Sequence, residues 1–410
     1  MADGTQEVRR RRVFYIPGYD PIHPRRYREL YRKEGAAQAE ISGYDLTLRP
    51  KTTKGPYGWH VDARIGDADS AADIEVLVWS DIVRGSMSNT IPATYAQLVR
   101  TAWTYVASGA LRRLMRLRKG PVIAALYPIG MLLVQLLVAL ALGAAVIAVA
   151  AELLGPVSGL LAGTVGLLSG GALAALVLRW FKKKDGTFLA YYLMHDYAYS
   201  ARWNGASPAP LERRMAEFAD TIAAALTDGA DEVLVVGHSS GAHLGVSILA
   251  DLIRSGRVPA NGPRLAFLSL GQVVPMVSFL PGAHRLRADL HFLSASEALT
   301  WVDVTAPGDG CAFALCDPVA VSGVAPLGKR WPLVFSAQFT RSLSSARWKE
   351  LRWRFFRLHF QYLCAFDRPL DYDYFQITAG PLSLATRYAG RPPSASRIDV
   401  PVSKFTSMAA

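Results

Sequence analysis

The stretch that decides the fold is Val233–Val246, VLVVGHSSGAHLGV. Its first four residues are apolar and mostly β-branched, which predicts a strand buried in a parallel sheet. The pentapeptide GHSSG (237–241) follows directly, and an apolar pattern of helical period follows that. Strand, G-x-S-x-G and helix in this order predict a sharp turn that lifts the Ser239 hydroxyl clear of the sheet. Gly237 and Gly241 leave the space that so tight a turn needs.

A serine raised on such a turn is a candidate nucleophile, which requires a base and a carboxylate that orients the base. Where this turn occurs, the chain order is serine, acid, histidine. Three histidines lie well beyond the turn: His284, His291 and His359. Only His359 also follows the best candidate acid, so we predict that it is the general base.

The best candidate acid is Asp309. It follows a predicted strand, TWVDVT (300–305), in the glycine-flanked loop APGDG (306–310), from which a carboxylate can turn inward. Asp303 lies inside the strand pattern and Asp317 precedes a proline, and both remain alternatives.

The oxyanion of an acyl-transfer reaction is held by two backbone N–H groups. One should be that of Ser240, next to the nucleophile at the start of the predicted helix. The other should come from IPGYD (16–20), where a short N-terminal strand ends in a glycine turn, and Tyr19 is our candidate.

Together, these motifs resemble the α/β-hydrolase superfamily. IPGYD resembles its oxyanion loop, GHSSG its elbow, APGDG its acid loop and RLHFQYL (357–363) its histidine position. The resemblance covers Arg12–Trp79 and Leu189–Leu382. It implies an α/β fold, a mostly parallel sheet flanked by helices, and catalysis through an acyl-enzyme with no metal and no organic cofactor. The chain differs in that the two strands usually preceding the oxyanion loop are missing or displaced into 41–65, and His359 lies in a helical pattern, Ser344–Phe366.

Two long apolar segments interrupt this pattern. Val122–Ala151 and Val157–Leu178 contain no charged residue and run for roughly 30 and 22 residues, whereas about 20 suffice to cross a bilayer. The second carries the glycine pairs 159/163 and 166/170, a spacing that lets helices approach closely in lipid. We predict a transmembrane hairpin; a buried helical lid is the alternative.

Basic residues flank both ends of the predicted hairpin, at Arg112–Lys119 and Arg179–Lys184. This pattern predicts that both ends, and the rest of the chain, face the cytoplasm at the inner (cytoplasmic) membrane. The three cysteines form no metal-binding spacing, which agrees with a reducing compartment. We attribute the net charge of +12 to contact with lipid headgroups and do not expect nucleic-acid binding.

Several further elements can be predicted. The sequence predicts a solvated basic arm at Arg9–Arg12, amphipathic helices at Pro24–Gly35 and Tyr95–Arg118, and a central strand at Ile74–Trp79. The predicted organisation is an N-terminal part of the hydrolase-like domain (1–84), a helical insertion with the hairpin (85–188), a C-terminal part (189–390) and a surface tail (391–410).

These features predict a membrane-anchored serine hydrolase that acts on a membrane lipid or an acyl ester. Because the hairpin leaves from the C-terminal end of the strand at Ile74–Trp79, where ligand loops of such sheets gather, the anchor and the active-site mouth should share an edge. The alternative is a catalytically inactive hydrolase-like module that binds lipid or scaffolds a partner.

Overall fold

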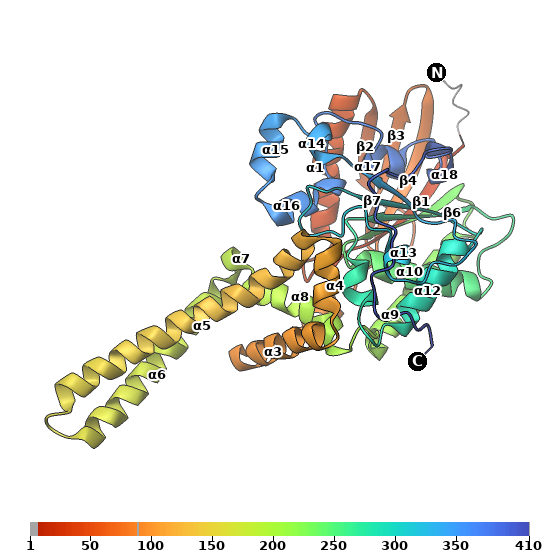
Figure 1. Cartoon of the computed structure of the whole chain (residues 1–410). Helices are drawn as coiled ribbons and strands as arrows, with labels where there is room; N and C mark the ends of the chain where they lie inside the picture. The colour runs from red at the N-terminus through yellow and green to blue at the C-terminus, as the bar shows by residue number, and fades with distance from the viewer. Residues whose placement is uncertain (1–6, 88–89, 410) are drawn as a thin grey trace. The chain divides into compact units, whose positions relative to one another are not determined.

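The computed structural model describes residues 7–87 and 90–409 and has an α/β fold (Figure 1). Its described residues form one eight-stranded sheet with the strand order β2-β3-β4-β1-β5-β6-β7-β8. The strands are β1 (Arg10–Ile16), β2 (Asp45–Pro50), β3 (Gly58–Ile65), β4 (Ala68–Val76), β5 (Glu232–His238), β6 (Arg264–Leu270), β7 (Thr300–Thr305) and β8 (Leu333–Ser336). Strands β4, β1, β5, β6, β7 and β8 pair in parallel, and β3 is antiparallel to both of its neighbours.

The chain forms two compact units. The sheet unit comprises residues 1–85, 106–121 and 203–410, and the helical unit comprises 86–105 and 122–202. The helices are α1 (Arg25–Ser42), α2 (Ser80–Ser86), α3 (Ile91–Ala107), α4 (Ala110–Leu117), α5 (Lys119–Leu154), α6 (Gly159–Lys183), α7 (Asp185–Phe188), α8 (Ala190–Arg202), α9 (Ala209–Ala225), α10 (Gly241–Arg254), α11 (Val274–Ser278), α12 (His284–Ala295), α13 (Pro318–Val321), α14 (Phe339–Ser342), α15 (Ser345–Leu351), α16 (Phe355–His359), η1 (Gln361–Leu363), α17 (Tyr374–Ala379) and α18 (Leu384–Arg387). The predicted insertion, 85–188, therefore differs from the helical unit, which ends at Arg202 and does not contain α4.

Helices cover both faces of the sheet. Helices α9, α10 and α12 lie on one face, and α1 and α17 lie on the other (Figure 1). Strand β5 is fully buried, as its continuous apolar run predicts for a central parallel strand. The core on the α1 face is rich in aromatic rings, such as Tyr31, which packs between Trp59 and Phe375. The carboxyl ends of the parallel strands β1, β5, β6 and β7 lie together, and the loops that follow them carry the predicted site residues.

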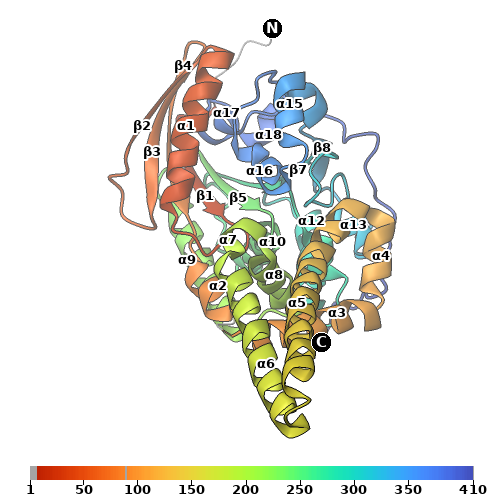
Figure 2. The same ribbon diagram turned by 90° about the vertical axis from the view of Figure 1, so that its left-hand side faces the viewer.

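Helices α5 and α6 form an antiparallel pair within the helical unit (Figure 2). They approach closely at two glycines, because a Cβ added to Gly143 would lie 2.8 Å from Gly170 O and one added to Gly170 would lie 2.6 Å from Gly143 O. Gly166 packs against Ile147, whereas a Cβ added to Gly159 or Gly163 would meet no atom of α5 within 4 Å. Both helices are long and apolar enough to cross a membrane, and only 22% and 17% of their most apolar windows are buried.

Two predicted helices are each divided in the structure. Tyr95–Arg118 forms part of α3 and all of α4, which are separated at Gly109, where φ is +73°. The predicted helix Ser344–Phe366 forms α15, α16 and η1. The second break accompanies tertiary packing, because Trp348 of α15 lies against Gly308 and Phe355 of α16 against Gly310, so the two helices pack separate rings on the acid loop.

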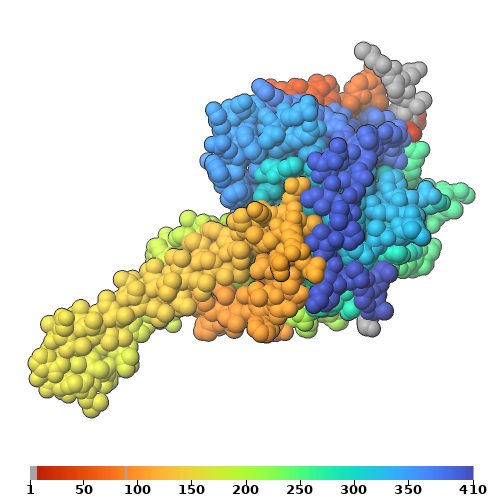
Figure 3. Space-filling model, in the orientation of Figure 1, coloured from red at the N-terminus to blue at the C-terminus, as the bar shows by residue number. Residues whose placement is uncertain are grey.

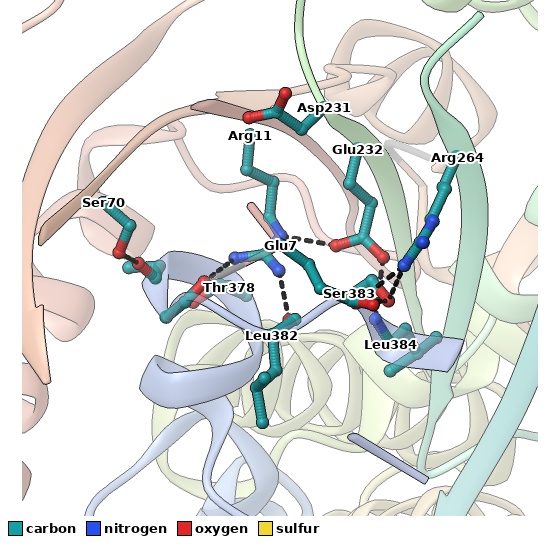
Figure 4. Close-up of polar contacts among 12 residues, drawn as sticks. Glu7, Arg11, Ser70, Asp231, Glu232, Arg264, Thr378, Leu382, Ser383 and Leu384 are labelled. Atoms are coloured by element: carbon teal, nitrogen blue, oxygen red, sulfur yellow. Dashed lines mark hydrogen bonds and ion pairs between the residues drawn. The ribbon is translucent and has the colours of Figure 1, made fainter. Parts of the chain in front are cut away.

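The predicted basic arm at Arg9–Arg12 is wrong, because β1 begins at Arg10 and Arg11 is buried. Arg11 Nε donates to Glu232 Oε2 at 2.6 Å, and its two terminal nitrogens donate to the carbonyl oxygens of Gly380 and Leu382, each at 2.6 Å (Figure 4). The guanidinium thus joins the starts of β1 and β5 to the segment between α17 and α18. This network lies at the edge of the sheet opposite the predicted site loops.

The described part of the predicted surface tail (391–410), residues 391–409, runs over the surface of the sheet unit without regular structure (dark blue in Figure 3). It is nevertheless fixed by backbone hydrogen bonds, because Ile398 N donates to Leu315 O at 2.7 Å and Asp317 N donates to Ile398 O at 2.9 Å. The buried Arg287 donates from Nε to Ser407 O at 2.7 Å. The tail therefore helps to hold the segment that follows the acid loop.

Candidate active site

Ser239 occupies the sharp turn between β5 and α10. Its φ is +56°, in the left-handed region that costs a non-glycine residue about 1–2 kcal/mol. Ser239 N donates to Leu270 O at 2.9 Å, which ties the turn to the end of β6. A Cβ added to Gly241 would lie 2.1 Å from Ile16 O, and one added to Gly237 would lie 2.7 Å from Gly241 O. Both glycines are therefore required by close backbone approach, as the motif predicts.

The loop after β1 lies directly against Ser239. A Cβ added to Gly18 would be 3.0 Å from Ser239 Cβ and 3.4 Å from its Oγ. This loop is held on both sides, because Trp79 Nε1 donates to Pro17 O at 3.0 Å and the buried Asp20 carboxylate accepts from Tyr27 Oη at 2.5 Å.

The two predicted oxyanion residues flank this contact. Tyr19 follows Gly18 and is buried, and Ser240 is the residue before α10. The first N–H groups of a helix have no acceptor within the helix, so the Ser240 N–H is suited to bind an anion.

His359 and Asp309 form a hydrogen-bonded pair. His359 Nδ1 lies 2.7 Å from Asp309 Oδ2, and both side chains are buried. Because a carboxylate only accepts, Nδ1 carries a proton, and in the neutral imidazole this leaves the lone pair on Nε2, where a general base needs it. Asp309 also accepts from Tyr362 Oη at 3.0 Å and from Cys311 N at 2.9 Å.

Tyr362 was not predicted as a site residue, although it lies three positions after His359 in RLHFQYL. Burial, followed by the charge of Asp309, raises the pKa of Tyr362 well above its usual value, so its hydroxyl remains a donor. It helps to fix the carboxylate that orients His359.

The His359 ring and Ser239 are both neighbours of the turn that follows β6. Leu270 O accepts from Ser239 N, and a Cβ added to the next residue, Gly271, would lie 3.0 Å from His359 Cε1. Within the described residues, the Ser239 hydroxyl makes no hydrogen bond, with His359 Nε2 or with any other group. Bonds of this kind are commonly long in enzymes without substrate.

His238 supports His359 from the strand side. Its ring packs against His359 with centroids 4.8 Å apart. In addition, His238 Nε2 lies 3.0 Å from His359 O, which fixes the proton on Nε2 because a carbonyl only accepts. Burial, followed by the neighbouring His359, lowers the pKa of His238 to about 3, so it is neutral near pH 7.

The alternative acids have other partners. Asp303 is buried on β7, and its Oδ1 accepts from Ser269 Oγ at 2.5 Å. Burial raises the pKa of Asp303 to about 8, so it is largely protonated at pH 7. Asp317 caps α13 and forms an ion pair with Lys329 at 2.6 Å.

The alternative histidine His291 bonds through Nδ1 to Val324 O at 2.8 Å. The other alternative, His284, lies beside Arg287, with its Nδ1 3.3 Å from Arg287 Nη2. Of the candidate pairs, only Asp309 and His359 therefore contact each other in the part of the chain that the structure describes.

One group of side chains has the composition of a metal site. Asp309, Cys311 and His359 each offer a ligand atom, and these atoms lie within 4.8 Å of one another. The group coincides with the hydrogen-bonded pair described above, whose Asp309 oxygens already accept from His359, Tyr362 and Cys311 N. The contacts of Asp309 and His359 are therefore explained by a site that transfers protons.

Comparison of the chain with models of known protein families, with curated proteins and with solved structures finds no match. The fold and the arrangement of the site therefore stand on the geometry of this chain alone. That geometry is an α/β sheet flanked by helices, with two helices that could cross a membrane, and is compatible with the superfamily that the motifs resemble.

Proposed function

We propose that this protein is a membrane-anchored serine hydrolase of the α/β-hydrolase type, which cleaves a lipid or another acyl ester. One observation carries the proposal. Ser239 has a left-handed backbone where β5 ends, and the turn after β6 that accepts its N–H also contacts His359, which is buried and hydrogen-bonds Asp309 at 2.7 Å. Strained backbone at a non-glycine residue is concentrated at functional sites, because the surrounding structure must hold it there.

In the proposed mechanism Ser239 Oγ attacks the substrate carbonyl while His359 Nε2 accepts the hydroxyl proton. Asp309 holds the imidazole in the required tautomer and stabilises the imidazolium that forms. The N–H groups of Tyr19 and Ser240 stabilise the oxyanion, and one such donor contributes about 3–4 kcal/mol. His359 then protonates the leaving group, and water releases the acyl group from Ser239. The chemistry requires no metal and no organic cofactor.

An ester that partitions into a bilayer is supported by the way the chain enters α5. Lys119–Pro121, at the start of this apolar helix, belong to the sheet unit. They lie against the acid loop, because a Cβ added to Gly120 would be 3.2 Å from Gly310 O. If α5 and α6 cross the inner membrane, with the sheet unit in the cytoplasm, the acid of the site is adjacent to the point where the chain turns toward lipid.

The test is hydrolysis of a long-chain acyl ester by the full-length protein in lipid nanodiscs. We expect turnover by the wild type and by Ser240→Ala, which keeps its backbone N–H, and a loss of at least 10³-fold in Ser239→Ala. A fluorophosphonate probe, which reacts with activated serines whatever the ester specificity, should label the first two proteins only. If none of the three is labelled while all are folded, the chain is instead the inactive lipid-binding module.

A further inference from the structure

The contacts between α5 and α6 show which residues of the two helices lie at the same depth along the pair. Gly143 meets Gly170, and counting 11 residues outward from each reaches Leu132 on α5 (143 − 11) and Phe181 on α6 (170 + 11). Phe181 lies between Trp180, whose side chain is 52% exposed, and Lys182. Tryptophan next to lysine and arginine at the end of an apolar helix marks the boundary between lipid and water. Leu132 is therefore at the level of this boundary.

Helix α3 packs onto α5 at this level. Tyr95 Oη donates to Leu132 O at 2.8 Å, and Leu98 joins Leu132 in one buried cluster with residues of α8. The side of α3 that carries Leu98, Thr101 and Tyr105 is buried. These contacts all lie within the helical unit, so they fix α3 beside the boundary region of the hairpin.

The opposite side of α3 is apolar and exposed. Val99, Trp103 and Val106 are 66%, 73% and 61% exposed and follow one another at intervals of four and three residues, so they form one stripe along the helix. Because the buried side of α3 already packs on the protein, this exposed apolar stripe needs a partner of its own.

The charge of the surrounding sequence indicates what this partner is. Between Asp81 and Glu152 the chain contains seven lysines and arginines and no aspartate or glutamate. Such a segment complements the anionic headgroups of a cytoplasmic leaflet. Tryptophan with aliphatic residues is the composition that interfacial helices insert between headgroups and acyl chains.

We propose that α3 is an interfacial helix, a third contact of this protein with the membrane, whose Val99–Trp103–Val106 stripe lies in the headgroup–acyl boundary next to the transmembrane hairpin. This inference rests on the membrane-spanning part of the proposed function and is independent of the chemistry at Ser239. The alternative that the experiment must exclude is a second copy of the chain, whose Val99–Trp103–Val106 stripe packs against this one.

The experiment measures tryptophan quenching by a brominated phosphatidylcholine in nanodiscs that also contain phosphatidylglycerol. We compare the wild type with three conservative variants, Trp103→Phe, Trp180→Phe and Trp331→Phe. Trp331 is the control, because it is half-buried, belongs to the sheet unit and lies just before β8, at the end of the sheet opposite the acid loop. We expect part of the lipid-quenched emission to be lost in Trp103→Phe and in Trp180→Phe and none of it in Trp331→Phe.

The outcomes separate the two proposals. Loss of lipid quenching in Trp180→Phe but not in Trp103→Phe overturns the role of α3 and leaves the hairpin in place. No loss in either variant means that the hairpin itself is outside the bilayer, and both membrane proposals fail. If Trp103 is protected from the lipid quencher and also from aqueous acrylamide, and Trp103→Ser converts a dimer to a monomer, the partner is a second copy and the interfacial assignment is wrong.

Discussion

Gly271 offers the sharpest test of the arrangement around His359. It follows β6 with φ +53°, and a Cβ added there would lie 2.8 Å from Tyr362 Cε2 and 3.0 Å from His359 Cε1. Carbon atoms in contact are about 3.5–4.0 Å apart, so Gly271→Ala must displace one or both rings by roughly 0.5–1 Å. A displacement of about 1 Å at a catalytic group can reduce a rate by about 10²-fold. We therefore expect a fluorophosphonate probe to label Gly271→Ala about 10²-fold more slowly than the wild type.

Gly256→Ala is the matched control. Gly256 has φ +68° and no neighbour within 4 Å of an added Cβ, so this variant carries the same backbone strain, about 1–2 kcal/mol, without a clash. The labelling rate is measured on each protein in nanodiscs, at a temperature where thermal unfolding shows that both variants are folded. Gly256→Ala should react within about twofold of the wild type, because strain at that site does not reach His359. Equal labelling rates for the two variants would refute the reasoning that the His359 ring at this position serves Ser239.

Three further outcomes follow from the same structure. Asp309→Asn should reduce labelling on the order of 10⁴-fold, because an amide cannot hold the imidazole in the required tautomer, whereas Asp303→Asn should leave labelling unchanged. Burial raises the pKa of Asp303 to about 8, so the folded protein holds a proton there that the unfolded chain releases above about pH 4. The folded state therefore loses stability as the pH rises toward 8, by up to about 1.4 kcal/mol per pH unit. Between about pH 5 and 7.5, the thermal unfolding midpoint of the wild type should fall relative to that of Asp303→Asn. Parallel pH profiles for the two proteins would contradict this. Arg11→Ala leaves the buried carboxylate of Glu232 without its ion-pair partner and should destabilise the sheet unit by about 3–5 kcal/mol. Arg10→Ala, at an exposed position of the same strand, should change the thermal unfolding midpoint little. Equal midpoints for the two variants would show that the buried pair is not stabilising.

The elements with strong local signals were predictable from the sequence. The fully buried strand β5 is a run of branched apolar residues, and the turn after it requires glycines that the sequence shows. Chain order paired Asp309 with His359, and the structure brings these side chains together, while their catalytic role stays a prediction. The two apolar helices were visible as uncharged segments, although α5 is longer than the 122–151 run and extends from Lys119 to Leu154.

The features that were missed depend on partners distant in sequence. Arg11 looked solvated because a run of arginines usually is. Its burial depends on Glu232, 221 positions away, and on the carbonyl oxygens of Gly380 and Leu382. The edge strand β8 has four residues, too few to show a periodic pattern. His238 and Tyr362 occupy motifs that were recognised, but their bonds to His359 and Asp309 depend on how β5 and η1 meet in space.

The central claim, that Ser239 is a nucleophile activated by His359, is tested most directly by locating the covalent adduct. The protein in nanodiscs is treated with a fluorophosphonate and digested, and mass spectrometry identifies the modified residue. The account predicts one phosphonylated site at Ser239 within the segment 233–254, lost in His359→Ala and kept in His284→Ala. A folded protein without an adduct at Ser239, or an adduct that forms at the same rate without His359, would contradict it.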